Sequence, residues 1–415
     1  MKYVYIETYG CSANQSHTET MEGILFANGY EKVDSPKKAD IILINTCIVK
    51  SPTENKIRDK IKLIVSKYSD KKLIIAGCGT DIGIFEKLAP NADFLSSHDS
   101  ESVVNFIENS ENKFTKSRVN PLVGITEISS GCLGNCTYCA VKLARGKLKS
   151  RVIKSISKEV EESVKDGCKE IWITSQDCGC YGIDIDSNLT VLLESIVKIE
   201  GCFRVRVGMM NPTHSKPILE KLIDILNDEK IYKFLHIPVQ TGSDSVLRKM
   251  KRGYTVKDFE NMVTVLRNGV SDLSIATDII IGFPEETGSD FEKTCELMER
   301  IKPDAVNFSK FGLRPKTEAA KLKQLTSNVI KERSKAFGPI VKRIVREQNK
   351  KWISKECTIL VNEKGKTKNQ YVGRNESYKP VVVESEKNIM GKFVKVKITD
   401  SDFTHLSAEI VKSSV

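Results

Sequence analysis

The sequence predicts an α/β protein built of three parts: an N-terminal parallel-sheet α/β domain, a partial (β/α)6 barrel and a small C-terminal antiparallel β-barrel. Over roughly the first hundred residues, and again beyond residue 120, short apolar runs alternate with amphipathic helical patterns, as in parallel sheets. From residue 357 onward, β-like runs follow one another without helices. A chain of 415 residues has room for this division, which we place at residues 1–110, 118–348 and 350–415.

The first part contains three predicted buried strands, each followed by a helical pattern. The strands are residues 3–7, 41–45 and 73–76, and the helices are residues 18–28, 52–67 and 82–88. In parallel sheets, functional residues gather at the carboxyl ends of the strands. A cysteine lies just beyond each of these strands, namely Cys11, Cys47 and Cys78. We therefore expect the three to converge, although any one buried cysteine is often only a small apolar core residue.

The second part follows a polar connection at residues 108–120. Six strands are predicted in it, at residues 122–128, 170–174, 203–207, 234–238, 274–282 and 304–309. Helical patterns follow each of the first five strands, among them residues 157–165 and 189–199. Six strands with helical crossovers indicate an incomplete parallel barrel, whose chemistry belongs at the carboxyl ends of its strands.

The third part begins after a basic helix that ends near Lys350. Five short strands are predicted at residues 357–362, 371–373, 380–383, 392–398 and 406–411, an arrangement typical of small barrels that bind RNA. Basic residues suited to RNA contact are Lys364, Lys366, Lys368, Arg374 and Lys379. The net charge of +11 also favours an anionic partner, with nucleic acid as the first candidate. A solvated lysine-rich surface on a structural appendage accounts for the same residues.

Composition limits the cellular setting. No apolar run has the length of a membrane-spanning helix, and the N-terminal MKYVYIETYG lacks the features of a secretory signal. We therefore expect a cytoplasmic protein without a membrane partner. Because that compartment keeps thiols reduced, the twelve cysteines indicate metal binding or catalysis rather than disulfides.

The strongest motif is Cys132-Leu-Gly-Asn-Cys136-Thr-Tyr-Cys139, which comes directly after the first predicted barrel strand. Three closely spaced thiolates suit a four-iron cluster and leave one iron without a protein ligand. Such an iron can chelate the amino and carboxylate groups of S-adenosylmethionine, just as catalytic metal sites keep a vacant position. A structural zinc site is the alternative, but such sites usually contain paired CxxC hooks, and no second pair occurs at a suitable distance.

Several other stretches share the pattern of one known family. They are residues 8–11, 45–47, 77–78, 145–146, 150–151, 236–243 and 278–285. With the cysteine motif, and in this order along the whole chain, they resemble the radical S-adenosylmethionine methylthiotransferases. Members of that family have an N-terminal three-cysteine domain, a radical core and a terminal barrel like the TRAM module of RNA-modifying enzymes. The sequences around both cysteine sets are most similar to those of the archaeal and eukaryotic group that acts on threonylcarbamoyladenosine in tRNA.

The resemblance implies two 4Fe-4S clusters. Their ligands would be Cys132, Cys136 and Cys139 for the first, and Cys11, Cys47 and Cys78 for the second. For S-adenosylmethionine it implies contacts from Tyr138, Ser175, Gln176, Gln240 and Gly282. Each of these five is also readily interpreted as an ordinary polar or turn residue at a strand end. No catalytic residue beyond the cluster ligands is assigned.

The implied reaction starts with cleavage of S-adenosylmethionine to a 5'-deoxyadenosyl radical. It ends with a methylthio group on carbon 2 of N6-threonylcarbamoyladenosine at position 37, beside the anticodon, and a second S-adenosylmethionine supplies the methyl. The implied partners are the tRNA anticodon stem-loop, a reducing electron donor and a sulfur donor. The alternatives are an isopentenyladenosine tRNA methylthiotransferase, a ribosomal-protein aspartate methylthiotransferase and a non-catalytic iron-sulfur or zinc RNA-binding protein.

The remaining six cysteines are interpreted as structural or incidental. Cys168, Cys202, Cys295 and Cys357 occur singly in helical or strand patterns. Cys178 and Cys180 lie beyond the second barrel strand, near the expected cofactor, but the family pattern does not require them. We interpret both as incidental, with a redox or ligand role as the alternative.

Overall fold

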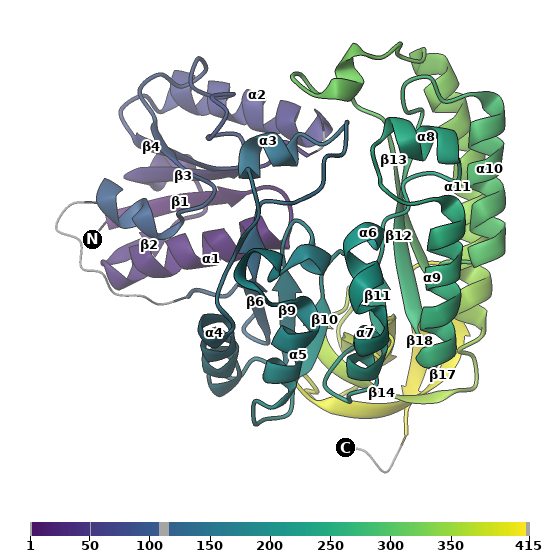
Figure 1. The fold of residues 1–415 in the computed structure, drawn as a ribbon. Helices are drawn as coiled ribbons and strands as arrows, with labels where there is room; N and C mark the ends of the chain where they lie inside the picture. The colour runs from purple at the N-terminus through teal and green to yellow at the C-terminus, as the bar shows by residue number, and fades with distance from the viewer. Residues whose placement is uncertain (1, 50, 108–115, 412–415) are drawn as a thin grey trace.

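The computed structural model describes residues 2–49, 51–107 and 116–411 of the chain (Figure 1). It contains a parallel-sheet domain, a six-stranded barrel core and a closed terminal barrel, so the predicted fold class is confirmed. Residues 108–115 of the predicted connection lie outside the described residues. Within the described ranges, no helix combines the length and the apolarity that crossing a membrane requires.

The N-terminal domain is a five-stranded parallel sheet with the order β2-β1-β3-β4-β5. Its elements are β1 (Lys2–Thr8), α1 (Ser12–Ala27), β2 (Tyr30–Lys32), β3 (Ile41–Thr46), α2 (Ser51–Lys67), β4 (Lys72–Gly77) and β5 (Asp93–Leu95). The three predicted strands correspond to β1, β3 and β4, and all of β3 is buried. Strands β2 and β5 were not predicted, because three residues are too few to show a periodic pattern.

Two helix predictions in this domain need correction. Helix α1 begins at Ser12 rather than at residue 18, because its polar first turns, which hide the apolar pattern, are buried against other parts of the chain. The helix predicted at residues 82–88 is wrong. That segment is a series of turns, including a hydrogen bond from the Leu88 amide to the Phe85 carbonyl at 2.9 Å. Gly83 has a φ of +66°, which a right-handed helix does not allow.

The core barrel consists of two three-stranded parallel sheets, β10-β9-β6 and β11-β12-β13. A parallel bridge between Met209 and His236 joins them, so the six strands form one open arc. The strands are β6 (Val123–Glu127), β9 (Glu170–Thr174), β10 (Arg204–Val207), β11 (Phe234–His236), β12 (Ser274–Ile281) and β13 (Ala305–Lys310), all close to their predicted ranges.

Helices cover the outside of this arc and enclose the largest apolar core of the molecule. The main ones are α4 (Ile153–Lys165), α5 (Leu189–Val197), α7 (Leu219–Leu226), α9 (Val256–Gly269), α10 (Gly288–Ile301) and α11 (Ser327–Lys350). Short elements line the carboxyl end, namely β7 (Ser129–Ser130), α3 (Val141–Arg145), β8 (Lys149–Ser150), α6 (Pro212–Ser215) and α8 (Asp244–Lys249).

The terminal domain is a closed barrel with the strand order β14-β15-β16-β18-β17. Its strands are β14 (Glu356–Lys364), β15 (Gln370–Arg374), β16 (Pro380–Glu384), β17 (Phe393–Ser401) and β18 (Leu406–Ile410). Four of its pairings are antiparallel, as predicted, whereas β16 and β18 pair in parallel. In Figure 1 this barrel, in yellow, lies beneath the core.

The terminal barrel packs on the amino ends of the core strands. The Asn362 amide donates to the carboxylate of Glu170, the first residue of β9, at 2.6 Å, and the Lys233 amide donates to the Glu376 carbonyl at 2.7 Å. Lys379, predicted as an RNA contact, is buried and pairs with Asp304 at 2.9 Å, so it belongs to this interface. The exposed basic residues predicted for RNA contact are Lys364, Lys366 and Lys368.

Candidate metal centres

The carboxyl ends of β1, β3 and β4 bring Cys11, Cys47 and Cys78, here called the N-terminal triad, to one place. A Cβ added to Gly10 would lie 3.0 Å from the Cys47 Sγ, so the chain before Cys11 passes directly against Cys47. Gly10 has a φ of +112°, a backbone conformation that favours glycine. Cys11 is the N-cap of α1, which fixes its position at the start of that helix.

Asn14, one turn into α1, holds the triad region together. Its amide nitrogen donates to the carbonyls of Thr46, at 2.7 Å, and Tyr9, at 2.8 Å. Its side-chain oxygen lies 3.7 Å from the Cys78 Sγ. Burial raises the pKa of the Cys47 thiol to about 11, so a bound cation is needed to keep this group ionised near neutral pH.

Arg145 lies at the end of α3 and its side chain is fully buried beside the N-terminal triad. The guanidinium donates to the Cys78 Sγ at 3.3 Å, to the Ser97 carbonyl at 2.7 Å and to the Asn14 side-chain oxygen at 3.0 Å. Burial raises the pKa of the Cys78 thiol, and the neighbouring guanidinium acts in the opposite direction. The pKa of Cys78 stays above its ordinary value, so a bound cation is needed here too to form the thiolate.

The same guanidinium reaches the core barrel through Glu127, the last residue of β6. The Arg145 Nη1 lies 3.6 Å from the Glu127 carboxylate, whose other oxygen lies 2.7 Å from the His17 Nε2 of α1. Burial acts to raise the pKa of Glu127, but His17 and Arg145 outweigh it and hold the pKa below its ordinary value. An ionised carboxylate thus links the triad to the mouth of the barrel.

The cysteine loop, residues 132–139, lies between β7 and α3 at the carboxyl end of the core. The Gly134 amide donates to the Cys132 Sγ at 3.2 Å. A Cβ on Gly134 would lie 3.3 Å from the Cys132 Sγ and 3.7 Å from the Cys136 Sγ, so the glycine keeps the space beside both sulfurs open. This open cradle fits a thiolate-held cluster.

A second buried arginine contacts the cysteine loop. Arg252 donates to the Cys136 Sγ at 3.2 Å, to the Pro238 carbonyl at 3.0 Å and to the Tyr254 hydroxyl at 3.0 Å. Each cysteine set thus has one buried guanidinium on one of its sulfurs. Hydrogen bonds to the sulfurs are among the features that tune the reduction potential of iron-sulfur clusters.

A cavity of about 360 Å³ opens beside the cysteine loop. Cys136 and Cys139 form part of its wall, together with three lysines, Lys142, Lys251 and Lys316. Lys251 is paired with Glu318 at 2.7 Å. The excess of ammonium groups makes this cavity suited to an anionic ligand.

The residues predicted to bind S-adenosylmethionine also lie at the carboxyl end of the barrel, and their contacts within the protein differ. The Tyr138 ring packs edge-on against Phe283 at 6.3 Å between centroids. The side chains of Ser175 and Gln176 are engaged within the protein, by the Asp177 amide at 3.1 Å and the Gly131 amide at 2.8 Å.

The other two predicted cofactor residues have unusual backbones. Gln240 has a φ of +74° and pairs with Ile279 in an isolated parallel bridge. Gly282 has a φ of +76°, and a Cβ there would lie 2.6 Å from the Ile330 Cγ1 of α11. The glycine is therefore required by the packing of α11 as well as by its conformation.

Sequence reasoning missed Arg145 and Arg252 as site residues. Arg145 falls in one of the family-like stretches, which was the only signal available for it. Arg252 precedes Gly253, whose φ of +70° marks a turn, but nothing in the pattern places that turn at the cysteine loop. Their contacts join segments 67 and 116 residues apart in the chain, which spacing alone does not indicate.

Comparison with protein families matches three segments of the chain. Residues 126–298 match the radical SAM superfamily, residues 3–93 match the uncharacterized protein family UPF0004, and residues 351–411 match the TRAM domain. The chain is 39% identical to a probable threonylcarbamoyladenosine tRNA methylthiotransferase of Pyrococcus horikoshii over 99% of its own length and all of the relative. It is 36% identical to the threonylcarbamoyladenosine tRNA methylthiotransferase of Xenopus laevis, covering 99% of this chain and 77% of that protein.

Among solved structures, the fold is similar to two radical S-adenosylmethionine proteins. The methyltransferase TsrM of Kitasatospora setae aligns with a TM-score of 0.54 and 15% identity, over 77% of each chain. The cobalamin-dependent enzyme OxsB aligns with a TM-score of 0.51 and 11% identity, over 81% of this chain and 56% of that one. At these identities the likeness concerns the fold.

Proposed function

The chain belongs to the threonylcarbamoyladenosine tRNA methylthiotransferase family, and we propose that it attaches a methylthio group to carbon 2 of N6-threonylcarbamoyladenosine at position 37 of tRNA. Its three parts, proposed at residues 1–110, 118–348 and 350–415, then supply the sulfur, the radical and RNA contact. The observation that carries this proposal is the pairing of two cysteine sets, each with a buried arginine on one sulfur. A tRNA substrate agrees with the expected cytoplasmic location.

The cysteine loop is the proposed holder of the radical-forming cluster. Cys132, Cys136 and Cys139 would bind it, and Arg252 would stabilise the charge on the Cys136 sulfur. When bound, the cluster and S-adenosylmethionine supply a 5'-deoxyadenosyl radical that removes hydrogen from the target carbon. Residues proposed to position S-adenosylmethionine are Tyr138, Ser175, Gln176, Gln240 and Gly282.

A second 4Fe-4S cluster is proposed on the N-terminal triad. Its support is the convergence of three strand-end cysteines and the donation from Arg145 to Cys78 at 3.3 Å. Arg145 also contacts Glu127 on the barrel, so it ties the triad to the mouth where the radical would form. Buried charged groups that make several directed contacts fix geometry well, which suits sulfur transfer over a short distance. The proposed partners are a sulfur donor and a reducing electron donor.

The lysine-lined cavity supports the choice of nucleoside. A threonylcarbamoyl group carries a carboxylate, whereas an isopentenyl group is apolar. Lys142 and Lys316 lie in the cavity wall beside Cys136 and Cys139, where that carboxylate would be attracted. An isopentenyl substrate gains nothing from these charges.

Contact with the anticodon stem-loop is proposed at the carboxyl end of the core and on the terminal barrel. The exposed lysines of the terminal barrel lie on β14 and in the loop that follows it, as Lys364, Lys366 and Lys368. Because this barrel packs on the amino ends of the core strands, these lysines would contact the tRNA away from the modified base. Phosphate contacts of this kind position the RNA and make its affinity salt-dependent.

The proposal is tested with purified protein reconstituted anaerobically with iron and sulfide. The reconstituted chain is incubated with threonylcarbamoylated and isopentenylated tRNA side by side, and nucleosides are measured by mass spectrometry. We expect about eight irons per chain, because two four-iron clusters are proposed. Methylthiolation should occur only on the threonylcarbamoylated tRNA.

Other outcomes identify the competing functions. Methylthiolation of isopentenyladenosine alone would make the chain a member of that other group, and modification of a ribosomal-protein aspartate would replace the tRNA proposal. Absence of 5'-deoxyadenosine under reducing conditions would leave a non-catalytic RNA-binding protein. A chain with Cys357, a buried cysteine of the terminal barrel, changed to Ala is the matched control and should keep full activity.

A further inference from the structure

A third group of metal-binding side chains, which shares Cys132 with the cysteine loop, lies where the second barrel strand ends. Within the described residues, Cys132, Asp177 and Cys180 place one ligand atom each within 4.8 Å of the others. Cys180 and Asp177 are buried, and Cys132 is half-buried. Two thiols and a carboxylate at this spacing match the ligands of a single thiophilic ion.

The Asp177 carboxylate is held in a fixed orientation. One oxygen accepts from the Gly179 amide at 3.0 Å and the Asn211 amide at 2.9 Å. The other oxygen lies 2.6 Å from the Nδ1 of His214. Such outer contacts are typical of carboxylates that bind metals, because they orient the ligand before the ion arrives.

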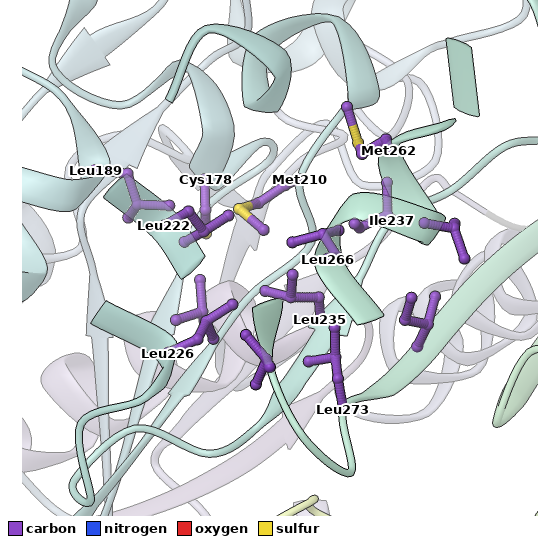
Figure 2. Packing of buried hydrophobic residues seen from close by; sticks show 14 of the residues in the cluster. Cys178, Leu189, Met210, Leu222, Leu226, Leu235, Ile237, Met262, Leu266 and Leu273 are labelled. Atoms are coloured by element: carbon purple, nitrogen blue, oxygen red, sulfur yellow. The ribbon is translucent and has the colours of Figure 1, made fainter. Parts of the chain in front are cut away.

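Cys180 and Cys178 differ although they are two residues apart in one short 3-10 turn, Cys178–Cys180. Figure 2 shows Cys178 in the apolar core with Leu189, Met210 and Leu222. Cys180 is absent from that core and its sulfur belongs instead to the group with Cys132. Cys178 is thus a matched internal control for Cys180.

We propose that Cys132, Asp177 and Cys180 bind a single divalent thiophilic cation, such as Zn²⁺ or Fe²⁺, in the cluster-free chain. Three protein ligands leave the fourth tetrahedral position to water. Binding releases the protons of both thiols, and no redox step is involved. Since Cys132 is also a proposed cluster ligand, the single ion and the four-iron cluster exclude each other. The site stands on side-chain geometry and does not depend on the proposed tRNA reaction.

The experiment is an anaerobic titration of the cluster-free full-length chain with Co²⁺, whose thiolate charge-transfer absorption reports sulfur ligands. Ions bound at the N-terminal triad are a background common to all variants. Relative to the parent chain, Cys180→Ser, Cys132→Ser and Asp177→Asn should each lose about one bound Co²⁺ per chain. Cys178→Ser and Cys136→Ser should keep it. Circular dichroism of each variant verifies that it is folded.

The pattern of losses separates this site from the cysteine loop. If Cys136→Ser loses the ion while Cys180→Ser retains it, the ion is bound by Cys132, Cys136 and Cys139, and the proposal is overturned. Equal binding by all variants would also overturn it.

A competition experiment provides a second readout. Zn²⁺ at the N-terminal triad lowers iron uptake equally in all variants, so the parent chain and Cys180→Ser are compared after the same saturation with Zn²⁺. The parent chain should take up about four fewer irons than Cys180→Ser, because the remaining ligands of the variant hold Zn²⁺ less tightly. If the two chains lose iron equally, Cys180 is not a ligand of the blocking ion.

Discussion

The Arg145 guanidinium donates to the sulfur of Cys78 at 3.3 Å, although the two residues belong to different domains. Arg145 follows the cysteine loop by six residues, so one short segment carries both the loop and the guanidinium that touches the N-terminal triad. This segment therefore contains the proposed ligands of one cluster and a hydrogen-bond donor to a proposed ligand of the other. Such an arrangement suits a reaction that combines a radical with sulfur transfer.

Changing Arg145 to Lys should destabilise the N-terminal cluster selectively. A single ammonium cannot reproduce the four directed contacts that the guanidinium makes, and loss of buried charged hydrogen bonds costs about 2–3 kcal/mol. Iron content after reconstitution should fall by about half, since one of two clusters is lost. Formation of 5'-deoxyadenosine, which measures the cysteine loop alone, should continue.

The control for this change is Arg300→Lys, an exposed residue of α10 that pairs with Glu260. It should keep full iron content, because surface ion pairs contribute little. Equal loss of iron from both proposed clusters in the Arg145 variant would contradict a selective role.

Gly134→Ala should prevent assembly of the cluster on the cysteine loop. The new Cβ would lie 3.3 Å from the Cys132 sulfur and 3.7 Å from the Cys136 sulfur, in space that the cluster needs. Iron content and 5'-deoxyadenosine formation report the loss, and we expect at least a tenfold decrease in the latter, equivalent to about 1.4 kcal/mol or more. Gly288→Ala, where an added Cβ has no neighbour within 4 Å, should behave like the parent. A fully active Gly134→Ala variant would contradict this prediction, because the added Cβ would then leave enough space for the cluster.

The strands of the barrel were predictable because each is a short segment rich in apolar residues that lies between helical patterns. Strand β9, for example, has its predicted bounds, Glu170–Thr174, and ends at the turn that carries Asp177 and Cys180. The sequence pattern does not indicate which side chains contact each other in the folded chain. The contact between Cys132 and Cys180 depends on how the cysteine loop folds over the mouth, and the two cysteines were therefore treated as unrelated.

Polar residues buried between domains were the main source of error. The first turns of α1 contain Asn14, Ser16 and His17, which precede the helix start predicted at residue 18. In the structure these side chains are buried against other parts of the chain. The Ser16 hydroxyl, for example, donates to the Ile125 carbonyl of the barrel at 3.0 Å. Lys379 was likewise predicted at an RNA-binding surface because its charge implies solvent exposure, and it is instead an interdomain ion pair.

Gly282→Ala should destabilise the core through steric strain. The residue has a φ of +76°, and its new Cβ would lie 2.6 Å from the Ile330 Cγ1. Unfavourable φ and overpacking together cost about 2–4 kcal/mol, measurable as a lower free energy of unfolding in urea. Adding Ile330→Ala to the same chain removes the clash but leaves the strained backbone. The double variant should therefore lose less than the sum of the two single changes, and strict additivity would argue against a clash.

Asp290→Asn should make the stability of the chain less sensitive to acid. The Asp290 carboxylate caps α10 and accepts hydrogen bonds from Ser243 at 2.5 Å, Ser245 at 2.9 Å and Thr287 at 2.7 Å. Burial acts to raise the pKa of this carboxyl, but the hydrogen bonds outweigh it and hold the pKa well below 3.8.

A depressed pKa in the folded state means that the ionised carboxylate stabilises the protein above the unfolded value and loses this effect as pH falls below it. At about pH 7 the Asn variant should be less stable by about 1–3 kcal/mol, because a cap and two buried hydrogen bonds are weakened. Between about pH 4 and pH 3 the difference from the parent should shrink, as measured by urea unfolding of the cluster-free chain across this range. Asp258→Asn is the control, since Asp258 forms the same capping box with Thr255 on the exposed start of α9. Its other partner is the exposed Lys216, at 2.9 Å, rather than buried serines, and exposed ion pairs contribute little to stability. Its loss of stability should be smaller at every pH, and an equal loss would mean that the cap alone, rather than the buried serines, accounts for the effect of Asp290.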